Sequence, residues 1–205
     1  MPAKKTIPER ATQERAIQTR KDLLEAARRI FARDGFEVAR LHDIAEDAGK
    51  TRGAFYAHFA DKEDLFFALI EDDVRRDSEF FENSLRPDSS LEERIQVMST
   101  HMEALIFDRQ RILLYLEFKM YAIRHPHNTK RLADLHAALC AKGLANKGKL
   151  LPELLVSSEK RRRAVYAAFA SVLDGLALNF YFDPAGLTRS EVRLRTERLV
   201  RERMT

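Results

Sequence analysis

The sequence predicts an all-α protein in which a small N-terminal unit of short helices precedes a larger helical body. Apolar residues recur at three- and four-residue spacing, and no run alternates like a strand for long. The 205 residues include only seven Gly and six Pro. Apolar residues make up 45% and charged residues 33%, which is typical of a soluble globular protein.

The first quarter of the chain predicts four helices. Residues 19–36 show helical spacing of apolar side chains and reach a stop signal at Gly35. Residues 41–49 and 51–59 follow as two short helices separated by a tight turn, and residues 61–85 form a long one. Three short elements before a long helix indicate a compact N-terminal unit, which we place at residues 19–65.

The rest of the chain, residues 66–205, predicts a body of longer helices. Breakers containing Pro or Gly separate them. The expected ranges are 89–107, 109–125, 128–147, 157–182 and 188–204.

The net charge of +4 lies in the N-terminal segment. Residues 1–21 contain six basic and two acidic side chains, and the remainder of the chain balances. We expect residues 1–18 to form a flexible basic arm, which either keeps the protein soluble or reaches a polyanion.

Neither a disulfide nor a membrane span is expected. Cys140 is the only cysteine, and the N-terminus lacks an apolar signal segment, so a cytoplasmic location is the default. Residues 164–182 are long and apolar, but Asp174 lies near their centre. A carboxylate there costs roughly 2.5–3.5 kcal/mol on insertion into a membrane. A helix buried inside a protein assembly explains the segment better.

The short helix expected at 51–59 has an unusual outer surface. Phe55 and Phe59 point into the small core, whereas Gly53, Ala54 and Ala57 lie on the opposite side. Soluble helices usually carry long charged side chains there. A surface of small residues lets a partner approach the helix closely.

The beginning of this helix favours an anion. Its first turn holds Arg52 and no acidic residue, whereas the next helix opens on Asp61 and Glu63 in the usual way. A cation at the positive end of the helix dipole is unfavourable alone but suits a docked phosphate.

Two helices joined by a tight turn, the second with a bare surface, indicate a helix-turn-helix that reads the major groove of DNA. Arg52 can pair with a guanine edge, and Thr51, Tyr56, His58 and Lys62 can reach phosphates. The alternative is an ordinary helical hairpin within a bundle.

Residues 35–70 resemble the N-terminal DNA-binding domain of TetR-family transcriptional regulators. The family pattern is matched at thirteen positions with fixed spacing. These are Gly35, Phe36, Ile44, Ala45, Ala48, Gly49, Thr51, Gly53, Tyr56, His58, Phe59, Lys62 and Leu65. The resemblance implies a homodimer on a near-palindromic operator, with repression relieved by a small molecule bound in the C-terminal body. It implies no enzymatic activity and no cofactor.

Two departures from the family pattern add charge. The usual pair of hydroxyl residues that opens the second helix is Ala39-Arg40, which removes a hydroxyl N-cap at a cost of about 1 kcal/mol. Arg40 is expected to bind phosphate instead, assisted by His42. Lys50 replaces the usual valine in the turn and is expected to face the DNA. Steep salt dependence should follow.

The resemblance also implies a dimer interface on the last two long helices. We expect it to contain Val165, Ala168, Phe169, Val172, Leu176, Phe180, Val192 and Leu199. The alternative is that these residues are buried within one subunit.

A ligand cavity is expected between the middle helices of the body. The candidate lining residues are His101, Met102, Leu105, Leu113, Leu116, Glu117, Met120, Tyr121, Leu139 and Phe169. The alternative is an ordinary core, with Glu117 in a salt bridge.

Other chemistry has little support. His125 and His127 in one loop are a weak metal signal, so no metal is expected, and Cys140 is interpreted as a small apolar residue with no nearby histidine. Two further hypotheses stay open: an effector-independent dimeric DNA-binding protein, and an enzyme with paired carboxylates in a helical bundle.

Overall fold

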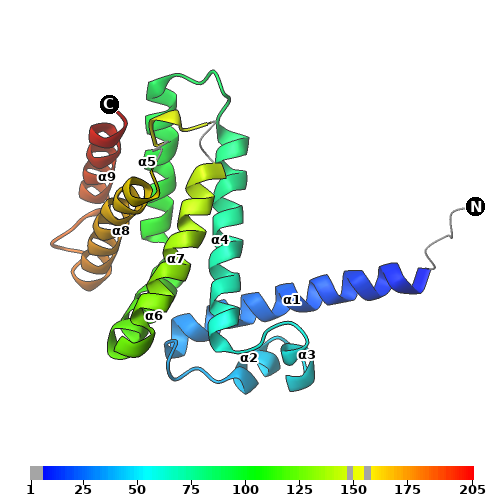
Figure 1. The fold of residues 1–205 in the computed structure, drawn as a ribbon. Coiled ribbons are helices and arrows are strands. Elements are labelled where there is room, and N and C mark those ends of the chain that lie inside the picture. The colour runs from blue at the N-terminus through cyan, green and yellow to red at the C-terminus, as the bar shows by residue number, and fades with distance from the viewer. Residues whose placement is uncertain (1–6, 147–149, 155–157) are drawn as a thin grey trace, which may run out of the picture.

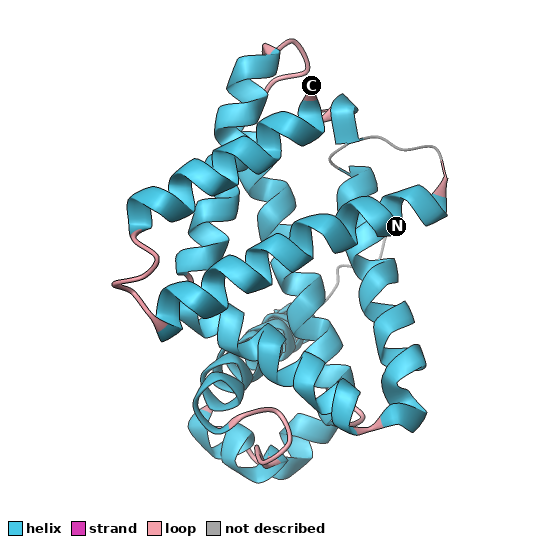
Figure 2. Ribbon diagram, turned by 90° about the vertical axis from the view of Figure 1, so that its left-hand side faces the viewer, coloured by secondary structure: helices cyan, strands magenta, loops and turns pink. Residues whose placement is uncertain are grey.

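The protein, described here by a computed structural model over residues 7–146, 150–154 and 158–205, contains helices joined by loops in these ranges (Figure 2). The N-terminal part contains α1 (Ile7–Asp34), α2 (Leu41–Asp47) and α3 (Arg52–Tyr56). The body contains α4 (Lys62–Ser84), α5 (Leu91–Phe107), α6 (Arg109–Arg124), α7 (Pro126–Asn146), the short 3-10 helix η1 (Pro152–Leu154), α8 (Glu159–Phe182) and α9 (Arg189–Met204). The predicted all-α fold is confirmed.

Side-chain caps explain most of the helix starts. Asp61, Ser90, Asp108, Ser158 and Thr188 each accept a hydrogen bond from the backbone N–H three residues later. Such a cap satisfies a backbone donor that has no partner inside the helix. Ser90 and Thr188 complete reciprocal capping boxes with a glutamate.

The expectation of a flexible arm over residues 1–18 is corrected where the structure describes the chain. Helix α1 already begins at Ile7, so residues 7–18 are helical, while residues 1–6 lie outside the described ranges. Residues 11–18 contain Ala, Gln, Glu and Arg but no Gly or Pro. A helix formed downstream therefore propagates backwards at little cost.

The N-terminal unit and the body share one hydrophobic core. Phe36, in the turn after α1, is fully buried. Its ring centroid lies 5.5 Å from Phe66 on α4, and 5.2 Å from Phe118 and 4.8 Å from Tyr121 on α6. Helix α4 and this aromatic cluster run across the domain boundary that the sequence analysis placed between residues 65 and 66. The boundary stays a prediction.

Helix α4 joins the two ends of the molecule (Figure 1). One end lies beside α1, α2 and α3, and the other reaches the region of α5. Helix α9 packs on α5, and α8 packs on α5 and α7. The elements that carry the candidate surface and the interior cavity are therefore linked by a single long helix.

Helix α8 is apolar, yet few of its residues are fully buried. Within the described residues, Arg163–Phe182 is the one segment long and apolar enough to cross a membrane, and only 11% of it is buried. The side chain of Asp174, near its centre, forms an ion pair with Lys119 on α6. Isolated in one subunit, α8 therefore exposes the apolar surface that the sequence analysis assigned to an assembly.

Candidate nucleic-acid interface and interior cavity

A tight turn sets the angle between α2 and α3. Ile44 and Ala45 bury the inner side of α2. Gly49 follows with φ +63°, a left-handed conformation that favours glycine, and Lys50 N–H donates to the Ala45 carbonyl at 2.8 Å. The chain can then turn at once into α3.

Helix α3 presents the small-residue surface that the sequence predicts. Phe55 and Phe59 are 0% and 2% exposed, so they anchor this segment in the core. Gly53 and Ala57 are exposed, and Ala54 is half-buried. A Cβ atom added at Gly53 would come no closer than 3.8 Å to a neighbouring side chain, so the space outside Gly53 is open.

Groups that suit an anion border this surface. Thr51 caps the helix by accepting from Ala54 N–H at 3.1 Å, and no acidic residue lies in the first turn. Arg52 and Tyr56 are exposed, with the guanidinium 5.5 Å from the centre of the tyrosine ring. The helix dipole and Arg52 thus act in the same direction on an approaching phosphate.

Three further candidates lie around α3 and at the start of α2. Arg40 is the N-cap residue of α2; it is exposed and makes no side-chain cap, in line with the missing hydroxyl. His42 is exposed, 3.7 Å from Glu46. His58 is half-buried beside Phe59.

Two lysines among the candidates have partners within the protein. Lys50, which was expected to face the DNA, forms an ion pair with Asp22 of α1 at 2.8 Å. Its role toward DNA stays a prediction. Lys62 donates to the backbone carbonyls of Glu37 and Ala39, at 2.7 and 3.1 Å. Burial lowers the pKa of Lys62. Both lysines therefore tie α2 and its neighbouring turns to the rest of the protein.

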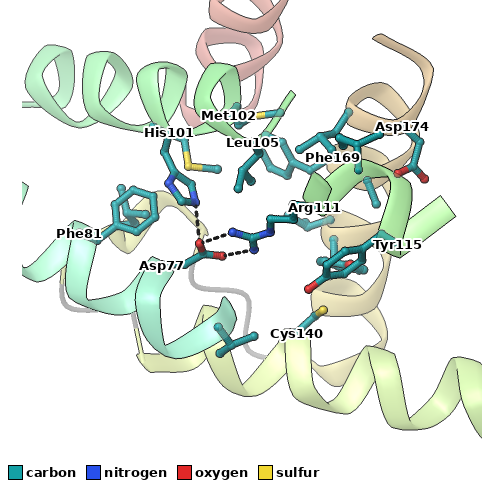
Figure 3. A pocket seen from close by; sticks show the side chains of 18 of the residues that line it. Asp77, Phe81, His101, Met102, Leu105, Arg111, Tyr115, Cys140, Phe169 and Asp174 are labelled. Atoms are coloured by element: carbon teal, nitrogen blue, oxygen red, sulfur yellow. Dashed lines mark hydrogen bonds and ion pairs between the residues drawn. The ribbon is translucent and has the colours of Figure 1, made fainter. Parts of the chain in front are cut away.

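The body contains a partly open cavity of about 170 Å³ between α4, α5, α6, α7 and α8 (Figure 3). Four of the ten candidate lining residues reach it: His101, Met102, Leu105 and Phe169. Its walls are mostly apolar, and Val74, Phe81, Met98, Ile112 and Leu173 complete much of them.

The other six candidates lie outside the cavity, and their assignment is corrected. Glu117 points at the turn after α1, where a Cβ atom at Gly35 would meet its carboxylate at 2.9 Å. Tyr121 and Leu139 pack on the core shared with the N-terminal unit, and Leu116 packs on a separate cluster near α8 and α9. Leu113 is half-buried, and Met120 is 44% exposed.

A buried ion pair that the sequence analysis missed forms one polar wall of the cavity. Arg111 donates both terminal nitrogens to the Asp77 carboxylate at 3.0 Å, and His101 Nε2 lies 3.5 Å from the same group (Figure 3). Burial raises the pKa of Asp77, but the hydrogen bonds from His101 and Arg111 outweigh burial and hold it well below its ordinary value. Asp77 is therefore ionised.

The sequence did contain a signal for this pair. Asp73 and Asp77 continue the apolar spacing of Phe66, Ile70 and Phe81 along α4. Acidic residues within such a stripe are buried and need a cationic partner.

A second ion pair separates the cavity from an open groove. Lys119 and Asp174 line both the cavity and an adjoining groove of about 620 Å³ between α6, α7 and α8. Tyr115 and Tyr166 also line both. Burial raises the pKa of each phenol, so both hydroxyls stay protonated.

Cys140 does have a histidine nearby, contrary to the sequence analysis. His136 is one helical turn away on α7, with its Nε2 atom 3.8 Å from the sulfur. Burial and the charge of Lys119 lower the pKa of His136 to about 4, so its ring is neutral at pH 7. Among the described residues no group of three metal-ligating side chains comes together.

Several residues expected at a dimer interface are buried within the subunit instead. Val192 is 0% and Leu176 is 7% exposed, and Phe169 lines the cavity. Val165, Ala168, Val172, Phe180 and Leu199 are half-buried. The large apolar side chains that remain exposed here are Leu178, Phe182 and Leu194, at 55%, 85% and 67%.

The N-terminal domain is similar to known regulators. The family described as bacterial regulatory proteins, tetR family, matches residues 23–69. The HTH-type transcriptional repressor AcnR of Corynebacterium efficiens is 45% identical over 69 residues, covering 34% of this chain and 37% of AcnR. The chain thus matches little more than a third of that relative's length.

Two comparisons extend over most of the chain. The nicotine-responsive repressor HdnoR of Paenarthrobacter nicotinovorans is 27% identical over 183 residues, covering 82% of this chain and 87% of HdnoR. The structure of the regulator FadR from Bacillus subtilis in complex with stearoyl-CoA has a TM-score of 0.59 at 16% identity, covering 88% of this chain and 96% of FadR. At that identity the likeness concerns the fold alone.

Proposed function

The chain belongs to the TetR family through its N-terminal domain, and we propose that it is a transcriptional repressor that binds a near-palindromic operator as a homodimer in the cytoplasm. The observation that carries this proposal is the outer surface of α3. Gly53 is exposed and open to solvent, and Arg52 and Tyr56 stand beside it. Such a surface permits close entry into a major groove, with Arg52 directed to a base edge and Thr51 to a phosphate. We propose no catalytic role.

Helix α8 supplies the dimer surface in this proposal. It is apolar and only 11% buried in one subunit, and Leu178 and Phe182 stand out from it. An exposed apolar surface of this kind marks an interaction site. Pairing of α8 and α9 with their copies would bury it and set the distance between the two α3 helices.

We propose that the cavity takes a compact ring compound as effector. An engineered apolar cavity of roughly 150 Å³ in another protein binds benzene, so about 170 Å³ suits one ring with small substituents. A ligand as long as stearoyl-CoA, the molecule bound to FadR, would need the adjoining groove as well.

The charges of the cavity favour an uncharged ligand. Its ionic side chains are already paired, Asp77 with Arg111 and Asp174 with Lys119. A charged ligand that replaced one partner would leave the other unpaired in a buried site, which costs several kcal/mol. The protonated hydroxyls of Tyr115 and Tyr166 can hydrogen-bond to a neutral polar atom.

Selection of bound duplexes from a random DNA pool tests the DNA-binding role. We expect a near-palindromic sequence whose affinity falls steeply with salt. Recovery of unrelated sequences, or of none, would refute the proposed operator binding.

A thermal-shift series with one ring and three charge states tests the effector class. Phenol and benzyl alcohol should raise Tm, whereas benzoate and benzylammonium should raise it much less. The variant Ala170→Leu, which reduces the cavity, is the matched control and should lose the response. Stabilisation by no compound would favour the alternative, a dimeric DNA-binding protein without an effector.

A further inference from the structure

A chain of buried charges leads from the cavity to the N-terminal domain. Arg28 on α1 donates to Asp73 on α4 at 2.6 Å, and Arg111 Nε lies 3.4 Å from the other oxygen of Asp73. The two terminal nitrogens of Arg111 hold Asp77, whose carboxylate also faces His101. The series Arg28, Asp73, Arg111 and Asp77 thus alternates in sign across α1, α4 and α6.

Arg111 occupies the central position in this series. Its side chain is 16% exposed and lines the cavity, whereas neither Asp73 nor Arg28 does. Asp73 and Asp77 lie one helical turn apart on α4, and Arg111 spans them. A guanidinium is a rigid planar fork, so it cannot turn toward a ligand without weakening its hold on both carboxylates.

Asp73 is sensitive to any movement of Arg111, because water cannot replace a partner that this buried carboxylate loses. Its side chain is 2% exposed, and its Oδ2 atom makes no hydrogen bond beyond the ion-pair contact with Arg111. If Arg111 moves, the charge on Asp73 rests on Arg28 alone. A buried charge responds strongly to such a loss, and the element that carries the remaining partner is α1.

We propose that Arg111 is the residue through which occupation of the cavity reaches the DNA-binding domain. This inference rests on the proposed function and adds its regulation. A neutral ligand whose carbonyl or hydroxyl oxygen accepts a hydrogen bond from Arg111 shifts the guanidinium and weakens its contact with Asp73, while Asp77 keeps His101 as a partner. Burial of Asp73 at the contact between α1 and α4 is then less favourable, although Arg28 keeps Asp73 and Asp72 as partners. Local opening that admits water to Asp73 therefore costs less, and the C-terminal half of α1 opens more often.

The variant Arg111→Gln removes a charged partner of Asp73 without any ligand. The variant Arg94→Gln is the matched control. Arg94 is similarly buried, 14% exposed, and binds Glu153 of η1 at 2.7 Å, with no partner on α1. Hydrogen exchange of the α1 amides at residues 19–34 is measured on the full chain. We expect Arg111→Gln to accelerate exchange there on the order of tenfold, and Arg94→Gln to leave it at the wild-type rate.

Two further variants guard against a general loss of stability. Arg111→Lys keeps the charge but not the fork, so it should give an intermediate exchange rate. Combined with Arg28→Gln, Arg111→Gln should add less acceleration than it does alone, because both act through Asp73. Arg94→Gln combined with Arg28→Gln should behave additively. Equal effects of Arg111→Gln and Arg94→Gln on α1 would overturn the proposal.

DNA affinity on the selected duplex separates this inference from the proposed function. Arg111→Gln should weaken binding at least fivefold, the lower end of common allosteric couplings, with Arg94→Gln near the wild-type value. Faster α1 exchange with unchanged affinity would refute the regulatory role and leave a structural link. Failure to select any duplex would remove the proposed function and this inference together.

Discussion

Two substitutions at Gly53 separate stability from DNA binding: Gly53→Ala should raise the free energy of unfolding, and Gly53→Leu should lower the affinity for DNA. A Cβ atom at this position meets only Thr51 Oγ1, at 3.8 Å, so alanine fits without strain. Alanine in place of helical glycine stabilises by roughly 0.5–1 kcal/mol. Because Gly53 lies in the first turn of a five-residue helix, we expect about 0.5 kcal/mol for Gly53→Ala, or a Tm increase of about 1–2 °C.

Gly53→Leu should keep the fold and lose the function. The longer side chain stands outside α3 and holds the helix away from base edges, so contacts such as that of Arg52 are broken. Each good base contact contributes roughly 1–3 kcal/mol, so we expect operator affinity to fall about 10- to 100-fold. Fluorescence anisotropy on the selected duplex, at fixed salt, measures it.

Gly49→Ala is the control for the stability measurement. A Cβ atom at Gly49 would meet nothing within 4 Å, but φ of +63° places alanine in the left-handed region. That conformation costs about 1–2 kcal/mol, so Tm should fall. A lower Tm for Gly53→Ala, or unchanged affinity for Gly53→Leu, would refute the interpretation of α3 as an open reading surface.

Three other predictions concern single side chains. Arg52→Ala should weaken operator binding by about 1–3 kcal/mol and relax discrimination at one base position, and equal affinity for every sequence would count against the docking mode. Because Arg52 is exposed and rests on the equally exposed Tyr56, stability should change by less than about 0.5 kcal/mol. His136 has a folded pKa of about 4 against about 6.5 unfolded, so the unfolded state binds more protons between these values, and stability should decrease by up to about 3 kcal/mol as pH falls from 6.5 to 4. Urea titrations of the wild type and His136→Gln measure this, and identical pH slopes would contradict it. Leu178→Arg should shift the protein from dimer to monomer in sedimentation, and an undiminished dimer would exclude this surface of α8.

The helix order and the α3 surface were predictable because both depend on local patterns. Caps and glycine stops mark helix ends within a few residues, and Phe55 and Phe59 fix the orientation of α3. The early start of α1 has one local signal that was not used, namely Pro8, because proline suits the first turn of a helix. Residues 11–18 are good helix formers, although their charge resembled that of a flexible tail.

The cavity and the partners of the two lysines depended on packing between helices distant in sequence. Periodicity shows which side of a helix is apolar but not which neighbour covers it. Thus Glu117 reaches the turn at Gly35 and not the cavity. Lys50 matched the expected position beside α3, yet Asp22 of α1 binds it. Asp77 could have been found from its place in the apolar stripe of α4, but its partner Arg111 could not.

Hydroxyl-radical footprinting on the selected duplex tests the central claim most directly, namely that two copies of α3 enter successive major grooves. We expect two symmetric protected half-sites, with centres about one helical turn or slightly more apart, on one side of the duplex. A single asymmetric footprint, or half-sites on opposite sides of the duplex, would contradict it.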